Sequence, residues 1–314
     1  MPWNVGQGEL MIEIPTCLVL GAGASMPYGF PSGIGLRKTI LKNFKNDRWH
    51  LLLSELGFED KDFIASFYSD FNISKILSID KFLELQPDYL SIGKLAIAFA
   101  LIPFEYHHNL LEIDDPPDRW YCELRQKLLT RNLNQLRSNK LKIITFNYDR
   151  SLEYFLYNVI RHSHPDATEN RCVEFLNMLD IIHIYGKLGN LPWEGQPSRP
   201  YKPDPTPEQY KIASEQIKIV SEPDQRRDLF NDPAQSLSAV QRIFFLGFGY
   251  DESNFNRLGM ERILDIEKKE IWGTTFNLGE AEINSIRNKW PYLKVSNNNN
   301  IDISRFFKEE ITLE

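Results

Sequence analysis

Short runs of apolar residues alternate along this chain with longer stretches in which apolar residues recur every three or four positions. The short runs predict strands, and they cover residues 16–20, 141–146, 179–185, 242–246 and 270–274. The periodic stretches between them predict helices. Strands joined by crossover helices run parallel in one sheet. The pattern therefore predicts an α/β fold, a parallel sheet flanked by helices.

The connection between the first and second predicted strands is long. About 120 residues separate positions 20 and 141, whereas a single crossover needs roughly a dozen or somewhat more. Helical periodicity covers 35–44, most of 49–110, and 120–136. We therefore expect one domain spanning 1–314, with a helical insertion at 48–118.

A second excursion precedes the fourth predicted strand. Residues 192–207 are rich in proline and polar side chains, which predicts an exposed loop or flexible lid. The segments 207–221 and 223–240 are polar and helical in pattern. Together they predict a loop and helical excursion over 192–240.

Composition is that of an ordinary soluble protein. The 314 residues include 36 Lys and Arg against 43 Asp and Glu, a net charge of −7. This balance gives no global attraction to nucleic acid or anionic membranes. The longest apolar run, 95–104, is half the length of a membrane span. We expect neither a membrane partner nor direct sequence-specific binding of nucleic acid.

Cysteine usage and the first residues point to the cytoplasm. The three cysteines, Cys17, Cys122 and Cys172, are widely spaced, and no C-x-x-C pair occurs. This spacing argues against a zinc ribbon and a disulfide framework, so no zinc is expected. Glu9 and Glu13 stand where a signal peptide would carry basic residues.

The most informative segment follows the first predicted strand. Gly21 and Gly23 let the backbone approach a ligand closely, and exposed N–H groups at such a turn favour phosphate oxygens. The usual dinucleotide fingerprint, G-x-G-x-x-G, continues directly into a helix. Here Met26 stands at the third glycine, and Gly29 and Pro31 delay the helix. A variant nucleotide site and a tight structural turn both remain open.

Three other strands end in residues that suit a ligand site. The second leads into Thr145-Phe-Asn-Tyr-Asp149, the third into His183-Ile-Tyr-Gly-Lys-Leu-Gly189, and the fourth into Leu246-Gly-Phe-Gly-Tyr-Asp251. In open α/β sheets, ligands bind outside the carboxyl ends of the strands. These segments and the glycine loop should therefore converge on one crevice.

Structural roles remain alternatives for each of these residues. Asn147 and Asp149 could cap the helix that follows them. His183 could be a core histidine with satisfied hydrogen bonds. Gly247 and Gly249 could be required for packing or for a turn.

Taken together and in this order, the motifs resemble the sirtuin-like (silent information regulator) superfamily, whose members bind NAD on a Rossmann-type sheet. The segment Ser78-Ile-Asp-Lys-Phe-Leu83 resembles the prokaryotic branch. Protein deacetylases of this superfamily carry Ile-Pro-Asp-Phe-Arg after the glycine loop and a four-cysteine zinc ribbon. This chain has Phe30-Pro-Ser-Gly33 and no such ribbon. The resemblance therefore points to bacterial NADases of antiphage defence.

The resemblance implies hydrolysis of NAD to nicotinamide and ADP-ribose. Asn147 would position the ribose or a water molecule, and a histidine would act as the base. We expect His183 to carry this role. The remaining residues that the resemblance places around NAD are Gly21, Ala22, Gly23, Ser25, Phe30, Pro31, Asp149, Tyr185, Gly247, Gly249 and Tyr250.

One position departs from the family pattern. The catalytic histidine of the family usually directly precedes the glycine, but Tyr185 precedes Gly186 here. On a strand, His183 would share the face of Tyr185 and lie about 7 Å further back. A bulge could bring His183 forward. Otherwise Tyr185 substitutes for it, or the protein binds NAD without efficient cleavage.

The leading hypothesis is thus a cytoplasmic NAD hydrolase that acts in defence. The resemblance implies regulation by homo-oligomer formation or by a separate partner, such as an Argonaute-like protein or a translocase-type ATPase. The alternative is a sensor module that binds NAD or ADP-ribose and controls a partner. An NAD(P)-dependent oxidoreductase is a weaker third hypothesis, because the third glycine and the ribose-binding acid are missing.

Overall fold

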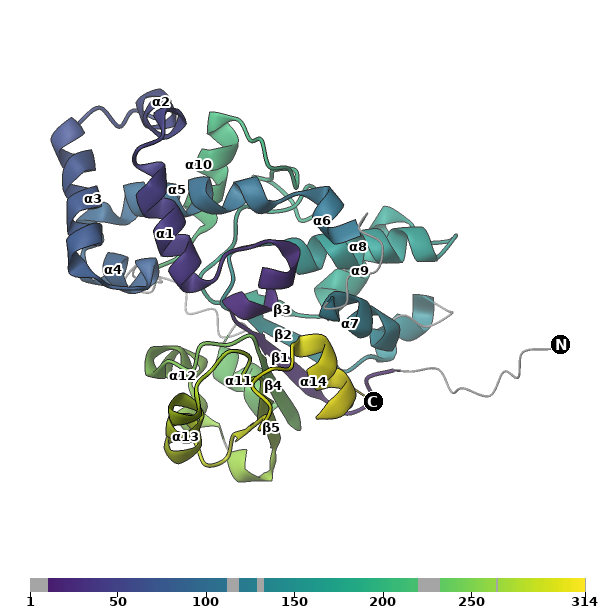
Figure 1. Ribbon diagram of the computed structural model, residues 1–314. Helices are drawn as coiled ribbons and strands as arrows, with labels where there is room; N and C mark the ends of the chain where they lie inside the picture. Colours follow the sequence, from purple (N-terminus) through teal and green to yellow (C-terminus); the bar gives the residue numbers. More distant parts are fainter. Residues whose placement is uncertain (1–10, 112–118, 129–132, 220–231, 264, 314) are drawn as a thin grey trace.

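The computed structural model describes residues 11–111, 119–128, 133–219, 232–263 and 265–313. Within them, six parallel strands form one sheet in the order β3-β2-β1-β4-β5-β6 (Figure 1). This is the doubly wound order of Rossmann-like folds, and it confirms the predicted fold class. The strands are β1 (Thr16–Leu20), β2 (Leu141–Thr145), β3 (Ile181–His183), β4 (Arg242–Leu246), β5 (Glu270–Gly273) and β6 (Lys294–Val295).

The central strand β1 explains why the apolar pattern located the sheet so well. All five of its residues are buried, and it pairs in parallel along its full length with both β2 and β4. A strand covered on both faces shows a continuous apolar run. The chain order reverses between β1 and β4, so their carboxyl ends form the topological switch point at which ligands bind in such sheets.

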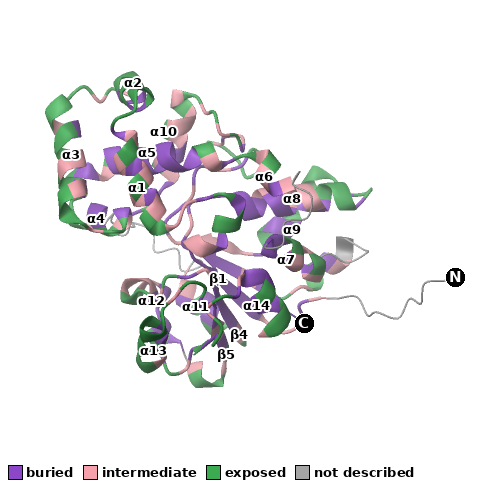
Figure 2. Ribbon diagram, viewed as in Figure 1, coloured by how far each residue is buried: buried purple, intermediate pink, exposed green. Residues whose placement is uncertain are grey.

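Helices cover both faces of the sheet. Figure 1 shows α7, α8 and α9 grouped around its β1–β3 half, and α11, α12 and α13 around β4 and β5. Their bounds are α7 (Trp120–Leu128), α8 (Ser151–Ser163), α9 (Glu169–Met178), α11 (Pro233–Ser238), α12 (Glu252–Leu258), α13 (Glu280–Lys289) and α14 (Ile303–Glu309). The buried positions follow the sheet and the inner sides of these helices (Figure 2).

A second, wholly helical layer lies beyond the carboxyl ends of the strands (Figure 1). It consists of α1 (Gly33–Asn43), α2 (Asp47–Glu55), α3 (Lys61–Ser74), α4 (Ile79–Leu85), α5 (Leu90–Leu101), α6 (His107–Leu111) and α10 (Pro207–Gln216). The helix α5 is its centre and packs against both α1 and α10. The insertion and the later excursion therefore build one layer together, which the sequence pattern had not indicated.

The apolar helix in this layer belongs to the core. The stretch Pro87–Phe104 is long and apolar enough to cross a membrane by length and composition alone, but 56% of it is buried inside the protein. Within α5, nine of the twelve residues are buried, from Ile92 and Gly93 to the run 95–101. Burial against α1 and α10 accounts for its apolar character.

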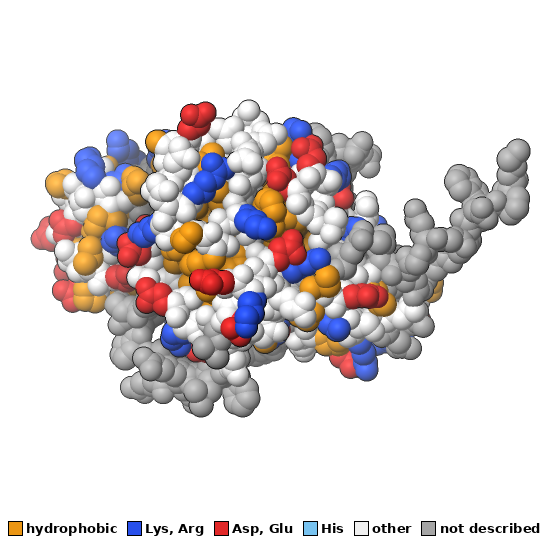
Figure 3. Space-filling model, turned by 90° about the horizontal axis from the view of Figure 1, so that it is seen from below, with side chains coloured by type: hydrophobic (Ala, Val, Ile, Leu, Met, Phe, Trp, Pro, Cys, Tyr) orange, Lys and Arg blue, Asp and Glu red, His pale blue; other side chains and the backbone are white. Residues whose placement is uncertain are grey.

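On the face shown in Figure 3, acidic, basic and apolar side chains are interspersed.

Several predicted boundaries need correction. The third strand stops at His183, whereas the apolar run had predicted 179–185. The periodic stretch 49–110 is broken into separate helices, because Gly57 and Lys75 adopt positive φ at helix ends and Pro87 and Pro103 interrupt the pattern. The short edge strand β6 was not predicted. Residues 129–132 and 220–231 of the predicted helices lie outside the described residues.

The segment 192–207 was expected to be an exposed loop or lid. It is a loop up to residue 206, and positions 192, 194–197, 202, 204 and 206 are exposed, but two side chains anchor it. Arg199 and Tyr201 are buried. The Arg199 guanidinium donates to Glu105 Oε2 at 2.6 Å, and Arg150 Nη2 donates to the same oxygen at 2.7 Å. Arg150 also donates to the main-chain oxygens of Gly189 and Arg199. This buried ion cluster fixes the segment against the helical layer.

The ion cluster generates a prediction for stability. Glu105→Gln removes the negative charge between two buried guanidinium groups and should lower the free energy of unfolding by about 3–5 kcal/mol. Urea denaturation measures this change. The matched control is Glu309→Gln in the exposed Arg305–Glu309 pair, which should cost less than about 1 kcal/mol. Equal effects of the two substitutions would contradict a structural role for the cluster.

Candidate functional site

The glycine loop after β1 lies directly against the turn after β4. The N–H groups of Gly21 and Gly23 donate to Leu246 O at 3.0 Å and to Gly247 O at 2.9 Å. A Cβ on Gly23 would stand 2.7 Å from Gly247 Cα, and one on Gly21 would stand 2.6 Å from Gly247 O. Gly247 itself has a φ of +56°. The glycines permit this backbone contact, so the packing interpretation holds for all three.

These hydrogen bonds also bear on the expected phosphate contacts. The resemblance assigned the N–H groups of Gly21 and Gly23 to a pyrophosphate. In the structure, the carbonyl oxygens of Leu246 and Gly247 already accept hydrogen bonds from both groups. The loop continues as two single 3₁₀ turns, Ala22–Ala24 and Met26–Tyr28, before α1 begins at Gly33. The predicted delay of the helix is confirmed. Ser32 supplies its N-cap, by accepting from Gly35 N at 3.1 Å.

Asn147 and Asp149 meet the glycine loop through a chain of hydrogen bonds. Asn147 Nδ2 donates to Gly21 O at 2.9 Å and to Ser25 Oγ at 3.0 Å. The Ser25 hydroxyl donates in turn to Asp149 Oδ2 at 2.7 Å. The structure therefore brings together four of the predicted site residues, which come from the ends of β1 and β2.

Asp149 also has the structural role weighed as its alternative. Its Oδ1 accepts from Ser151 N at 3.1 Å and from the Ser151 hydroxyl, at the start of α8. Burial raises the pKa of Asp149 above its usual range, although hydrogen bonds from Ser151 and Ser25 favour the ionised form. The carboxyl group thus links the glycine loop to α8.

His183 reaches the same cluster from β3, through the main chain of Asn147. Its Nδ1 lies 2.9 Å from Asn147 O, and its Nε2 lies 2.6 Å from Glu153 Oε1 on α8. The side chains of His183 and Glu153 are only 8% and 6% exposed. Burial favours neutral Glu153, but the His183 ring and Lys187 outweigh it and lower the pKa of this carboxyl group.

Glu153 is the main residue that the sequence interpretation left out of the site. It lies on α8, the helix that begins just after Asp149. The available signal was a carboxylate at 153 among the apolar positions 152, 155 and 156 of α8, all of which are buried. A buried carboxylate requires a partner, and His183, at the end of the next predicted strand, was a candidate for that partner.

Tyr185 does not share the surroundings of His183, contrary to the expected strand geometry. The chain leaves β3 after His183, and Gly186 has a φ of +65°. The Tyr185 ring packs edge-on against Phe146, with 5.8 Å between centroids, and its hydroxyl accepts from Arg257. Burial raises the pKa of Tyr185, so this group stays a neutral phenol.

The helical layer closes over these strand ends through α4. Arg257, which contacts Tyr185, forms an ion pair with Glu84 of α4. The Tyr148 hydroxyl donates to Asp80 Oδ1, also on α4. Burial raises the pKa of Asp80 from 3.8 to about 6, against a hydrogen bond from Ser78 and the charge of Arg257. The motif at 78–83 thus supplies a contact between the two layers.

The remaining predicted residues lie at the edge of this cluster or outside it. Phe30 is buried against Phe104, with 6.1 Å between ring centroids, and Pro31 is partly buried. The Tyr250 hydroxyl donates to Thr274 O at 2.8 Å and so faces β5. Gly249 is exposed, and no atom would lie within 4 Å of a Cβ there.

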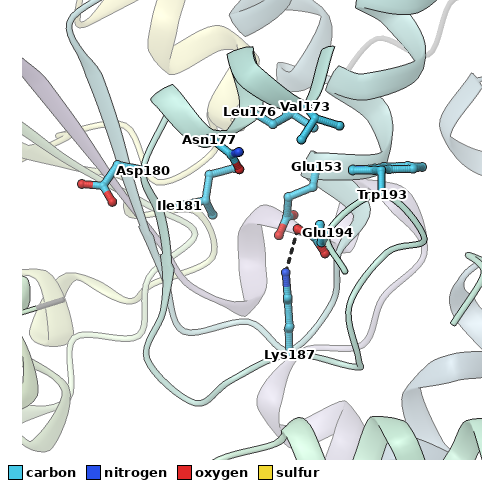
Figure 4. Close-up of a pocket in the computed structure, with 9 residues that line it drawn as sticks. All are labelled: Glu153, Val173, Leu176, Asn177, Asp180, Ile181, Lys187, Trp193 and Glu194. Carbon is cyan, nitrogen blue, oxygen red and sulfur yellow. Dashed lines mark ion pairs between the residues drawn. The ribbon is translucent and has the colours of Figure 1, made fainter. Parts of the chain in front are cut away.

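A pocket of about 180 Å³ opens beside Glu153, between α8, α9, the start of β3 and the loop that follows β3 (Figure 4). Lys187 and Glu194 form an ion pair of 2.7 Å across it. Its lining residues are Glu153, Val173, Leu176, Asn177, Asp180, Ile181, Lys187, Trp193 and Glu194. Asp180 is itself paired with Lys142 at 2.6 Å. The pocket therefore reaches Glu153, whereas His183 is not among the residues that line it.

Among the residues that the structure describes, no group of three or more His, Cys, Asp or Glu side chains is placed to hold a metal ion. The three cysteines are free thiols, of which Cys17 and Cys172 are buried and Cys122 is exposed.

No model of a protein family matches the chain, and no curated protein matches it.

The contact between the glycine loop and Gly247 predicts a position-specific effect. Gly23→Ala places a methyl group against backbone atoms that cannot rotate away, so we expect a loss of about 1–3 kcal/mol in the free energy of unfolding. Gly249→Ala, in the turn of Gly247 but with no atom within 4 Å of the added Cβ, is the control and should change it by less than about 0.5 kcal/mol. Thermal and urea denaturation measure both. A tolerated Gly23→Ala would show that the two loops are not in contact.

The α4 contact predicts a dependence on pH. Asp80 binds a proton more tightly in the folded protein, with a pKa of about 6, than at its usual pKa of 3.8. Its contribution to stability is therefore complete below pH 4 and is lost as the pH rises through 6. We expect Asp80→Asn to be more stable than the wild type by about 1–2 kcal/mol at pH 7 and to show no such gain at pH 4. Exposed Glu267→Gln should show neither effect in urea denaturation.

Proposed function

We propose that this protein is an NAD hydrolase that cleaves the bond between nicotinamide and ribose, releasing nicotinamide and ADP-ribose. The observation that carries the proposal is the place of Asn147. Its side chain lies 2.9 Å from the glycine loop of β1, beside the switch point of a doubly wound sheet. A dinucleotide that follows the loop would bring its ribose to this residue.

The reaction needs few catalytic groups. The electron pair of the C–N bond moves onto the pyridinium nitrogen, and nicotinamide leaves as a neutral molecule. The anomeric carbon then develops oxocarbenium character, and a water oxygen forms the new bond while its proton passes to the solvent. The protein has to hold the ribose and place that water. In our proposal the Asn147 side chain does both through Oδ1, because its Nδ2 already donates to Gly21 O and Ser25 Oγ. Asp149 holds Ser25 in turn.

The glycine loop contributes shape to the binding of NAD. The N–H groups of Gly21 and Gly23 are bonded to the β4 turn, so other groups of the loop would bind the pyrophosphate. The absence of side chains at 21, 23 and 247 lets the two strand ends approach each other.

The cellular role belongs to the same proposal and rests on the sirtuin-like resemblance. We propose an effector of bacterial antiphage defence that depletes NAD in the cytoplasm. Such an activity has to be restrained in a healthy cell. Self-assembly, or a separate partner such as an Argonaute-like protein or a translocase-type ATPase, would supply that restraint.

One observation favours a second candidate function, a module that senses NAD or ADP-ribose without efficient cleavage. Both ring nitrogens of His183 lie within hydrogen-bonding distance of an oxygen acceptor. A ring held in this way offers no lone pair to a substrate proton. Tight binding of NAD without release of nicotinamide would identify this function.

The proposal is tested by incubating the purified protein with NAD and separating the products by chromatography. We expect nicotinamide and ADP-ribose in equal amounts. Asn147→Ala should lower kcat by ~100-fold or more, because no side-chain oxygen then orients the ribose or the water. Asn256→Ala, at an exposed position of α12, is the control and should keep wild-type activity. Calorimetric titration with NAD separates lost catalysis from lost binding. Full activity in Asn147→Ala would refute the proposed site.

A further inference from the structure

We infer that His183 serves the proposed hydrolysis as a positioning residue: a charged imidazolium, paired with Glu153, that holds the main chain of Asn147. This inference rests on the proposed function and changes the role expected for His183. A base takes a proton from the water or from a ribose hydroxyl. A positioning residue keeps the amide of Asn147 where the reaction needs it.

Both nitrogens of the His183 ring contact oxygen atoms. A backbone carbonyl can only accept, so His183 Nδ1 donates its proton to Asn147 O at 2.9 Å. At Nε2 the partner is a carboxylate oxygen at 2.6 Å, a distance typical of a charge-assisted hydrogen bond. Since an ionised carboxylate also only accepts, the ring carries a proton on each nitrogen.

The surroundings of Glu153 favour its ionised form. The groups around it are the His183 ring, the buried carboxyl of Asp149 and, in the pocket, Lys187, Glu194 and Asp180 (Figure 4). Glu194 is paired with Lys187, and Asp180 is paired with Lys142. Lys187 favours the carboxylate over the neutral acid independently of the ring, and a charged ring adds to this effect. Both partners of the pair are almost completely buried. Neither charge can be removed alone without leaving the other unpaired in a site of low dielectric constant.

The His183–Glu153 pair holds the main chain of Asn147. The main chain of Asn147 is bound on both sides, because its N–H donates to Thr145 Oγ1 at 3.0 Å and its carbonyl accepts from His183. Thr145 and His183 are themselves opposite each other in the β2–β3 register. With the peptide fixed in this way, the Asn147 side chain can meet Gly21 and Ser25 only in one orientation. An imidazolium has no lone pair, so it cannot accept the proton of the attacking water.

The decisive experiment uses two double variants that differ only at position 183. In His183→Asn/Glu153→Gln, the Asn Nδ2 occupies the place of the imidazole Nδ1 and can still donate to Asn147 O, and the glutamine leaves no buried charge. This variant should keep kcat within about 10-fold of the wild type. His183→Ala/Glu153→Gln lacks the donor and should lose ~100-fold in kcat with little change in KM, the cost of a small misplacement at a reacting centre. Equal losses in both variants would assign His183 to base catalysis and overturn the inference.

A spectroscopic measurement tests the ring without reference to activity. Nitrogen NMR of the labelled wild-type protein at pH 7 should show both His183 ring nitrogens protonated, and Glu153→Gln should show one of them unprotonated. A neutral ring in the wild type would overturn the inference. If the wild type releases no nicotinamide, only the proposed function fails. The NMR result, together with a higher unfolding temperature for the Asn variant than for the Ala variant, then decides whether the ring holds Asn147.

Discussion

The close contact between the ends of β1 and β4 is the constraint on which the rest of the site depends. Backbone meets backbone at Gly23 and Gly247, where a single Cβ would lie 2.7 Å or less from its neighbour. That contact places Gly21 O where the Asn147 amide can reach it. Ser25 and Asp149 complete the chain of hydrogen bonds into α8. A side chain at either glycine would therefore disturb the packing and the polar cluster together.

Buried charge joins the helical layer to this site. Glu105 at the end of the α5 region holds Arg150, which directly follows the Asn147–Asp149 segment, and Arg199 of the later excursion. On another side, Asp80 of α4 accepts from Tyr148 in the same segment. Because unpaired buried charges are costly, these contacts fix the helical layer over the strand ends. The residues after β2 consequently connect the sheet, the site and the insertion.

The sequence revealed the sheet well and the site in part, for physical reasons. Strands such as β1 and β4 are buried on both faces, so their apolar runs mark them directly. The two-residue strand β6 buries too little to leave such a pattern. Partners far apart in the chain are not visible in a local pattern. The Arg199–Glu105 contact spans 94 residues, which is why 192–207 was interpreted as exposed.

The same reasoning explains why the histidine was the hardest residue to interpret. Alternation along a strand placed His183 and Tyr185 on one face, but the strand ends at His183 and the chain turns before Gly186. Tyr185 then packs against Phe146 and under the guanidinium of Arg257. The His183 ring instead bonds to Glu153. A histidine between a carbonyl and a buried carboxylate is well suited to hold a backbone and poorly suited to accept a proton. In the proposed reaction, contact with the ribose and the water therefore falls to Asn147.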